Sequence, residues 1–344
     1  MKIGYWLIPS VLCLPFIYIT TFCRWLSYDD EGIIMRHSYN VLRGAVPYRD
    51  VPFEYGPLFI WINDLYFSIA GLTHLSSRLG ILFLILLTTL LVQVLAVRVF
   101  KSYPAATVGA TIWLFIALSF NGESLHPGWL IALCLTLQGL LLSSQFRFRW
   151  PCLGLLTGII SGLKIHIGIC SGAALLMLAL LRAGVPKKIA VLPGILLAIL
   201  WMFPLSALFV QDFDLRLIFF TAAPILIALM LPIAFTLHAQ IGAGQPLERS
   251  SVAKRECLEI FLATLLSTIG LYLLAGMLYG FLPMYESLIA LPKDRYFVLQ
   301  GGVITYTNVQ QLIFILIVTT AGGMALLKNH TGLCSCILGA ECLV

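Results

Sequence analysis

Residues 24–64 read RWLSYDDEGIIMRHSYNVLRGAVPYRDVPFEYGPLFIWIND, and they interrupt a chain that is otherwise almost continuously apolar. The stretch gathers acidic, aromatic, proline and glycine residues, whereas long apolar runs lie before and after it. Ionisable residues are costly inside an apolar environment, and they are retained there mainly for function. We therefore expect the functional site in this stretch.

The composition of the chain excludes a protein with a water-facing surface on all sides. Only 10% of the 344 residues are charged, and the mean hydropathy is +0.99. A membrane-spanning helix needs about 20 predominantly apolar residues, because each residue rises about 1.5 Å through a hydrocarbon core about 30 Å thick. The sequence predicts an all-α polytopic membrane protein.

Apolar runs of spanning length recur along the chain, and we expect about ten transmembrane helices. The predicted spans are residues 4–23, 79–97, 104–120, 128–145, 151–163, 165–181, 189–210, 217–238, 257–281 and 303–327. We expect the first to be retained and not cleaved as a signal peptide, because no small-residue cleavage pattern precedes Cys23. The spans form one membrane domain at residues 1–328, and a short tail follows at 329–344.

The loops between these spans alternate in charge, which predicts their orientation. Basic residues of short loops are retained on the cytoplasmic side. One set of loops carries Lys2, Arg98, Lys101, Arg147, Arg149, Arg182, Lys187, Lys188, Arg249, Lys254, Arg255 and Lys328. The opposite set carries 11 of the 15 acidic residues, so the long loop at 24–78 is predicted to be external. We expect a multi-pass protein of the bacterial inner membrane with its active site on the periplasmic face, because the chain is compact and shows no retention signal.

The external loop shows the pattern of two surface helices. The first is predicted from Glu31 to Arg43, because Gly44 supplies a stop and Pro47 prevents continuation. The side chains near one of its faces are Ile33, Ile34, His37, Val41 and Leu42. A second helix is predicted to begin at Pro57, which suits a first helical position, and to run toward Ala70. Its aromatic residues suit the level of the lipid headgroups: Trp61, Tyr66 and Phe67.

Three adjacent acidic residues, Asp29, Asp30 and Glu31, stand just after the first span. Mutual repulsion and a low-dielectric surrounding raise the pKa of at least one such carboxyl, which makes it a suitable proton acceptor. The alternative is that Asp29 or Asp30 caps the surface helix by accepting hydrogen bonds from its free N–H groups. We favour the cap for Asp29 and chemistry for Asp30.

Three segments of the N-terminal half together match a known pattern. The pair Asp30-Glu31 follows the first span and precedes a surface helix and the run Gly44–Asp50. Tyr55-Gly56-Pro57-Leu58 opens the second surface helix, and Gly158–Lys164 is a glycine-rich segment that ends in lysine. In these features the chain resembles the GT-C class of multi-spanning glycosyltransferases, which includes the protein O-mannosyltransferases and the lipid A aminoarabinose transferases. The remaining spans match that class in hydropathy alone.

The resemblance implies an enzyme that transfers a hexosyl or pentosyl group from a polyprenyl-phosphate sugar to a lipid, glycan or protein acceptor. Asp30 would take the proton from the acceptor hydroxyl as that hydroxyl attacks the anomeric carbon, and the configuration would invert. Glu31 would orient the acceptor or a neighbouring side chain. Members of this class often carry a soluble domain after the last span, whereas this chain carries a short tail there. The alternatives are a truncated chain and a minimal member of the class, and for a minimal member acceptor recognition is expected from the outer loops.

A leaving phosphate needs cationic partners. Lys164 lies between two short apolar runs, where a charge is costly and therefore often functional, although snorkelling to the headgroups is the alternative. His166 follows two residues later, and Arg295, in the outer loop before the last predicted span, has the planar fork that suits phosphate. Glu54 is a candidate for lining the pocket, with pairing to a nearby arginine as its alternative.

No cofactor is expected, and metal-independent catalysis is favoured. Asp29, Asp30 and Glu54 could hold a hard divalent ion through oxygen atoms, and that alternative stays open. The nine cysteines show no metal-ligand spacing. A nucleotide-sugar donor is disfavoured, because no phosphate-cradling glycine loop precedes a soluble helix, and nucleic acid is not expected as a partner.

A transporter or flippase for lipid-linked sugars is the rival interpretation. Multiple spans with many glycine and proline residues and an intramembrane Lys164 would also suit alternating access. However, the chain shows no paired inverted halves, and its ionisable residues concentrate on one face. A non-catalytic membrane scaffold ranks third.

Overall fold

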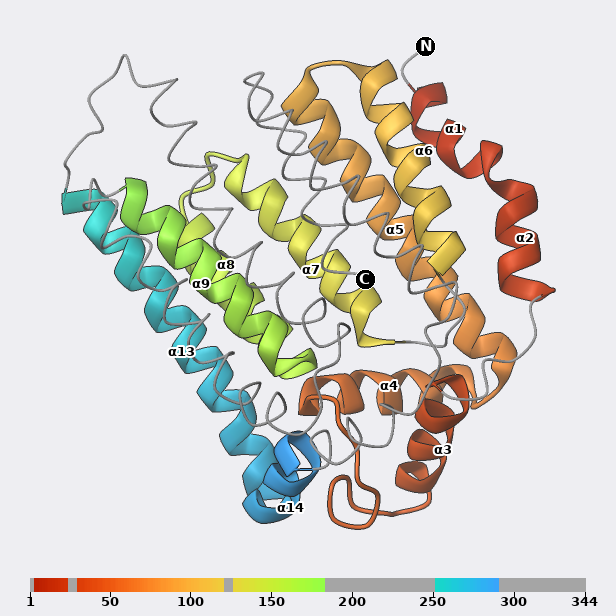
Figure 1. Cartoon of the computed structure of the whole chain (residues 1–344), viewed down its shortest axis with the longest axis vertical. Helices are drawn as coiled ribbons and strands as arrows, with labels where there is room; N and C mark the ends of the chain where they lie inside the picture. Colours follow the sequence, from red (N-terminus) through yellow and green to blue (C-terminus); the bar gives the residue numbers. More distant parts are fainter. Residues whose placement is uncertain (1–2, 24–29, 121–125, 183–250, 291–344) are drawn as a thin grey trace, which may run out of the picture.

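The computed structural model describes residues 3–23, 30–120, 126–182 and 251–290, which are coloured in Figure 1. Helices hold 84% of the described residues, and no strand occurs among them, which confirms the all-α class. The predicted spans at 189–210, 217–238 and 303–327 lie outside the described residues, as does the tail at 329–344.

The predicted first span is two short helices instead of one. α1 (Ile3–Leu12) and α2 (Leu14–Phe22) meet at Cys13. Pro15 stands in the first turn of α2, and proline both lacks an N–H donor and clashes with the preceding turn of a continuous helix. The apolar run at 4–23 is therefore interrupted near its middle.

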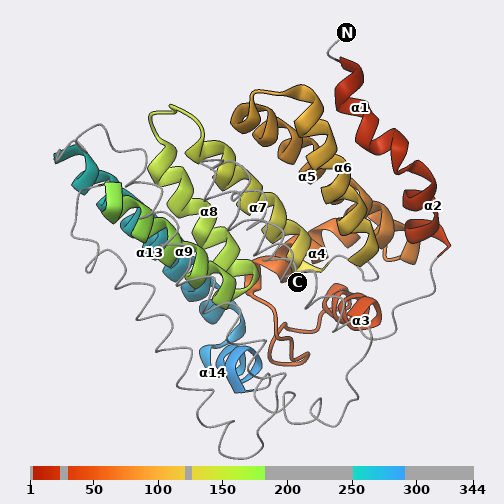
Figure 2. The ribbon, with the colours of Figure 1, turned by 45° about the horizontal axis from the view of Figure 1, so that its top comes forward.

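Six longer helices lie side by side and run along a common direction (Figures 1 and 2). They are α5 (His74–Phe100), α6 (Tyr103–Phe120), α7 (Pro127–Leu142), α8 (Arg149–Leu163), α9 (Ile165–Arg182) and α13 (Ser251–Tyr279). Each covers one predicted apolar run, so those six predictions of helix position are confirmed. Among the described residues, two helical segments, His74–Phe100 and Arg255–Tyr279, are long and apolar enough to cross a membrane, which is weak support for membrane association.

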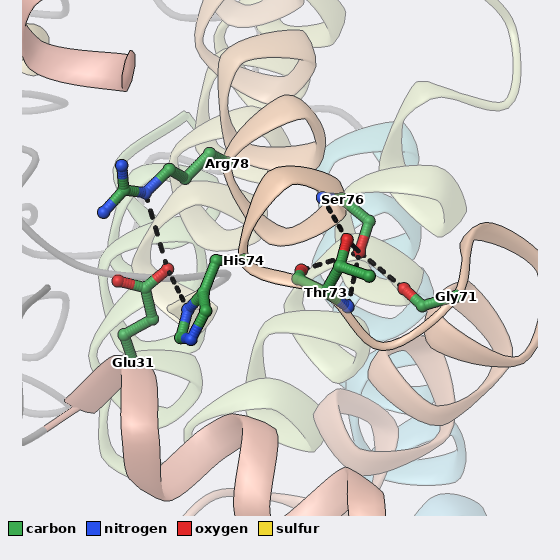
Figure 3. Close-up of polar contacts among 6 residues, drawn as sticks. All are labelled: Glu31, Gly71, Thr73, His74, Ser76 and Arg78. Atoms are coloured by element: carbon green, nitrogen blue, oxygen red, sulfur yellow. Dashed lines mark hydrogen bonds and ion pairs between the residues drawn. The ribbon is translucent and has the colours of Figure 1, made fainter. Parts of the chain in front are cut away.

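Local chemistry explains where α5 begins. The Thr73 hydroxyl accepts a hydrogen bond from the Ser76 backbone N–H at 3.0 Å, and the Ser76 hydroxyl accepts one from the Thr73 N–H at 3.1 Å. This reciprocal pair is a capping box, which satisfies donors that the first turn of a helix otherwise leaves free (Figure 3).

The two surface helices lie at one end of the long helices, where α4 (Pro57–Ala70) crosses beneath them and α3 (Asp30–Leu42) packs beside α4 (Figure 1). Both predicted positions are confirmed, and the start of α4 at Pro57 is as expected. The side chains predicted to share one face of the first helix are not equally buried, because Ile34 and His37 are buried whereas Ile33 and Leu42 are exposed. The buried side chains of α3 are Glu31, Ile34, His37 and Ser38. Packing against neighbouring helices, and not hydrophobicity alone, selects this face.

A glycine stripe brings α8 and α13 close together. Gly154, Gly158 and Gly162 recur every fourth residue and therefore share one face of α8. Cβ atoms added at Gly154 and Gly162 would lie 2.7 Å from Ala263 Cβ and 2.9 Å from Leu271 Cδ1 of α13. Small residues at this spacing allow the close backbone approach that membrane helices use. These three glycines therefore pack α8 against α13.

The opposite end of the helices, remote from α4, carries basic side chains. Arg98 near the end of α5 donates to the Leu140 carbonyl of α7 at 3.4 Å, and Arg149 at the start of α8 lies 3.7 Å from a Glu256 carboxylate oxygen of α13. The α4 end carries the carboxylates of Glu31, Asp50, Glu54 and Asp64. Among the described residues, acidic side chains are thus more numerous at the α4 end, whereas basic side chains occur at both ends, since Arg36, Arg43, Arg49 and Arg78 also lie at the α4 end.

Candidate functional site

The segment between α3 and α4 packs its aromatic side chains inward. Tyr48, Phe53 and Tyr55 are buried, and the Tyr48 hydroxyl donates to the Tyr55 carbonyl oxygen at 2.7 Å. Tyr48 adopts φ +66°, a conformation that non-glycine residues seldom take, and its buried side chain and hydrogen bond hold it there. This loop therefore has a defined shape next to α4.

The start of α4 is docked on the end of α8. The Gly56 backbone N–H donates to the Leu163 carbonyl oxygen at 3.0 Å. A Cβ atom at Gly56 would lie 2.7 Å from the Gly162 carbonyl carbon, which is backbone and cannot turn aside. The contact sets Tyr55, just before Gly56, beside Lys164, just after Leu163.

Lys164 occupies the break between α8 and α9, where its backbone is extended. Its Nζ atom lies 5.7 Å from the centroid of the Tyr55 ring, within the range of a cation–π interaction. The His126 ring stands edge-on to the same tyrosine at 5.4 Å, and its Nδ1 caps α7 by accepting from the Gly128 N–H at 3.1 Å. The Tyr55 ring therefore contacts both a lysine and a histidine at the α4 end of the helices.

Glu31, predicted as the partner of the catalytic aspartate, reaches from α3 toward the start of α5 (Figure 3). Its side chain is only 3% exposed, and Oε1 lies 3.5 Å from His74 Nδ1 and 3.7 Å from Arg78 Nε. These contacts give Glu31 a structural role in holding α3 against α5. Its role in orienting an acceptor stays a prediction.

Asp30 is the first residue of α3 and directly precedes this anchored glutamate. A helix N-terminus favours a nearby negative charge, because the helix dipole is positive there. Because Glu31 is held by His74 and Arg78, the backbone of the adjacent Asp30 is held near the start of α5. Asp29, for which a capping role is predicted, lies outside the described residues.

The other predicted site residues are spread around this end. Glu54 is half-buried and adjacent to Tyr55, and His166 is the second residue of α9, two positions after Lys164. Arg49 forms an ion pair with Asp50 at 3.0 Å. Arg295 lies outside the described residues. Within the described ranges, no group of three or more His, Cys, Asp or Glu side chains is arranged to hold a metal ion.

Three polar residues at the contact between α3 and α4 were not predicted as site residues. His37 and Ser38 of α3 are buried, and Asp64 of α4 is half-buried. His37 Nε2, Ser38 Oγ and Asp64 Oδ1 are each shielded from solvent and have no hydrogen-bond partner in the part of the chain that the structure describes. The spacing of Ser38 from Ile34 and Glu31 by one and two helical turns could have indicated its inward position.

The buried surroundings alter the protonation of two of these groups. Burial raises the pKa of Asp64 to about 6, and the nearby Ser38 hydroxyl counteracts this shift in part without closing a hydrogen bond. Burial lowers the pKa of His37 to about 4, so this imidazole is neutral at pH 7. The contact thus holds a neutral histidine and a carboxyl that changes charge near pH 6.

Comparisons with known proteins do not add to this description. Searches against models of protein families, against curated proteins and against solved structures found no match. The candidate site therefore rests on the residues and contacts described above.

We expect Asp64→Asn to make stability less dependent on pH. Because the pKa of Asp64 is about 6 in the folded protein and about 3.9 in an unfolded chain, its stabilising contribution is complete below about pH 4 and is lost as the pH rises through 6. At pH 8 the variant should exceed wild type by about 1 kcal/mol in free energy of unfolding, after allowance for partial exposure to water. Thermal unfolding in detergent micelles between about pH 4 and pH 8 measures the difference.

Asp50→Asn serves as the control of opposite sign. Hydrogen bonds from the Arg49 side chain and the Val46 N–H hold the pKa of Asp50 below its usual value. Its contribution is therefore present above the unfolded pKa and is lost as the pH falls. An Asp64→Asn variant with the same pH profile as wild type would contradict the assignment.

Proposed function

We propose that this protein is an integral membrane glycosyltransferase of the GT-C type, which moves a sugar from a polyprenyl-phosphate donor to an acceptor on the external face. The observation that carries the proposal is the arrangement at the α4 end. Lys164 is held over Tyr55 there, at the same end as Asp30 and the two surface helices. Lipid-linked donors present their phosphate at the membrane surface, where such an arrangement would meet it.

Exposed apolar side chains support the proposed membrane location. The outer face of α13 carries large hydrophobic residues that remain exposed: Leu258, Phe261, Leu262, Leu265, Leu266, Ile269, Leu273, Leu274, Met277 and Leu278. Water-soluble monomers rarely expose so large a contiguous apolar surface. Lipid chains would cover this face, and the break at Lys164 would then lie near the headgroups.

The proposed reaction is a single displacement. The Asp30 carboxylate accepts the proton of an acceptor hydroxyl while the hydroxyl oxygen forms a bond to the anomeric carbon. The bond from that carbon to the phosphate oxygen breaks, and polyprenyl phosphate leaves with the electron pair from the opposite face. The Lys164 ammonium offsets the negative charge on the leaving phosphate. Glu54, His166 and Arg295 are proposed to bind the donor as well.

Mass spectrometry of lipids that co-purify with the protein from native membranes tests this proposal. We expect a polyprenyl-phosphate sugar on Asp30→Asn, where the donor is bound and not consumed, and its depletion on Lys164→Ala by about tenfold, since a charged contact contributes about 1.5–3 kcal/mol. The mass of the attached sugar would identify the donor.

Arg147→Ala is the matched control, because Arg147 also lies over an aromatic ring, 5.5 Å from the Phe148 centroid, but at the opposite end of the helices. It should retain the lipid. If none of the folded proteins carries such a lipid, the transferase proposal fails, and a transporter or scaffold becomes the better interpretation. Equal depletion in Arg147→Ala and Lys164→Ala would remove Lys164 from the donor site.

A further inference from the structure

The contact between α3 and α4 contains buried polar atoms that the proposed reaction does not use. Ser38 and Asp64 lie close together across this contact, and neither Ser38 Oγ nor Asp64 Oδ1 has a hydrogen-bond partner in the described ranges. Buried polar groups are nearly always hydrogen-bonded, so unpaired groups on facing helices call for a partner. Asp64 is only half-buried, and the contact therefore reaches the molecular surface at this residue.

A third element extends this polar cluster. Trp61, one turn before Asp64 on α4, donates from Nε1 to the Tyr279 hydroxyl at the end of α13 at 2.6 Å. Asp64 is close enough to Tyr279 for the two groups to interact electrostatically. The cluster thus joins α3, α4 and α13 at the end of the helices where Lys164 lies.

A continuous row of rings connects the cluster with the lysine. The Lys164 ammonium lies over Tyr55, the Tyr55 ring is 5.0 Å from Phe53, and the Phe53 ring stacks on His37 at 4.0 Å. His37 directly precedes Ser38 in the sequence. One end of the row is cationic and the other carries uncharged or acidic groups.

The chemistry of the cluster indicates what it would bind. A serine hydroxyl both donates and accepts, a neutral imidazole nitrogen does one or the other, and a carboxyl oxygen accepts. No cation is present among these groups to neutralise a phosphate, and the carboxylate would repel one. A neutral hydroxyl group can form hydrogen bonds with both Ser38 and Asp64.

We infer that the contact of α3, α4 and α13 is a subsite for a sugar hydroxyl, with Ser38 and Asp64 as the groups that bind it. The inference rests on the proposed function, because a sugar phosphate would place its phosphate near Lys164 and its hydroxyls toward the other end of the aromatic row. The hydroxyl belongs to the donor sugar or to a glycan acceptor, which share this chemistry.

Binding of defined lipids to the purified full-length chain in detergent tests the inference. The probes are undecaprenyl phosphate and its mannosyl, glucosyl and aminoarabinosyl esters, each titrated by microscale thermophoresis. Ser38→Ala and Asp64→Asn should weaken binding of the sugar-bearing lipid that wild type prefers by about threefold to tenfold, because the first removes a hydrogen bond and the second replaces a charge-assisted hydrogen bond by a neutral one. Both variants should bind undecaprenyl phosphate as wild type does. Ser68→Ala, which removes an exposed hydroxyl from α4, is the control.

The possible outcomes separate the two proposals. If wild type binds none of these lipids, the transferase proposal and the subsite both fail. Wild type and both variants could all prefer a sugar-bearing lipid to undecaprenyl phosphate by the same factor. In that case the KM for a glycan acceptor is measured, and a rise of at least threefold in the variants assigns the hydroxyl to the acceptor. An unchanged KM overturns the subsite alone. Equal weakening of all lipids, with or without sugar, would show a merely structural role and also overturn it.

Folding is not expected to obscure these measurements. Ser38→Ala removes an unpaired buried polar atom, and Asp64→Asn preserves the shape of the side chain. Thermal unfolding of each variant should occur at or above the wild-type temperature at pH 8. A variant that unfolds at or above the wild-type temperature is folded, so its lipid affinities and its acceptor KM decide the inference as stated above.

Discussion

Asp30→Asn should lower the turnover of sugar transfer by about 100-fold to 10,000-fold, the usual contribution of a positioned general base. An asparagine amide matches the size of the carboxylate but cannot accept the proton of the attacking hydroxyl. Donor binding should persist, because the substitution leaves Lys164 and the surface helices unchanged. Turnover is measured as release of polyprenyl phosphate from a donor lipid in reconstituted vesicles.

The neighbouring Glu31 supplies the contrast for this prediction. Its carboxylate is buried against His74 and Arg78, so Glu31→Gln should mainly lower the free energy of unfolding, by about 1–2 kcal/mol after allowance for the exposure of His74. Asp30→Asn should leave the unfolding temperature within a degree or two of wild type. Full turnover in a folded Asp30→Asn protein would remove Asp30 from the mechanism and favour a helix-capping role.

Gly56→Ala is the substitution with the largest expected effect on stability. The backbone of Gly56 has φ −66° and ψ 159°, which alanine adopts without strain. The expected effect is therefore steric overlap of the added methyl group and not backbone strain. The added methyl group would press on the Gly162 carbonyl group, and the neighbouring hydrogen bond from Gly56 to Leu163 would lengthen. Because a helix backbone cannot move aside as a side chain can, we expect a loss of about 3 kcal/mol, the upper part of the range for overpacking.

The same substitution should also reduce donor binding, since it separates Tyr55 from Lys164. Thermal unfolding in detergent measures the first effect and lipid titration the second. Gly32→Ala is the control, because no described atom lies within 4 Å of a Cβ at Gly32 and alanine favours the interior of α3. A Gly56→Ala protein as stable as Gly32→Ala would contradict the tight docking of α4 on α8.

Local sequence signals predicted most of the described helices. Pro57 suited a first helical position and α4 begins there, and the apolar runs matched the six long helices to within a few residues at most ends. Such signals act over a few residues, so they predict a helix without any knowledge of which other helices pack against it. The break near Cys13 was missed, although Pro15 marks it, because the apolar run continues on both sides.

The sequence also predicted the chemical character of the α4 end. It indicated the two surface helices and the acidic loop, since each depends on composition and order along the chain. The role of Lys164 in binding a phosphate stays a prediction. The roles of individual residues were less accessible. The buried contacts of Glu31 are an example, because they are made with His74 and Arg78, which lie more than forty positions away in the sequence.

Order along the chain therefore determined which segments are helical and where their charges gather. Only the tertiary structure decided that Gly154, Gly158 and Gly162 serve helix packing, that Ser38 lies near Asp64, and that Tyr55 contacts both Lys164 and His126. The physical reason is range: helix formation depends on neighbours three or four residues apart, whereas these contacts depend on which helices approach and which faces they present.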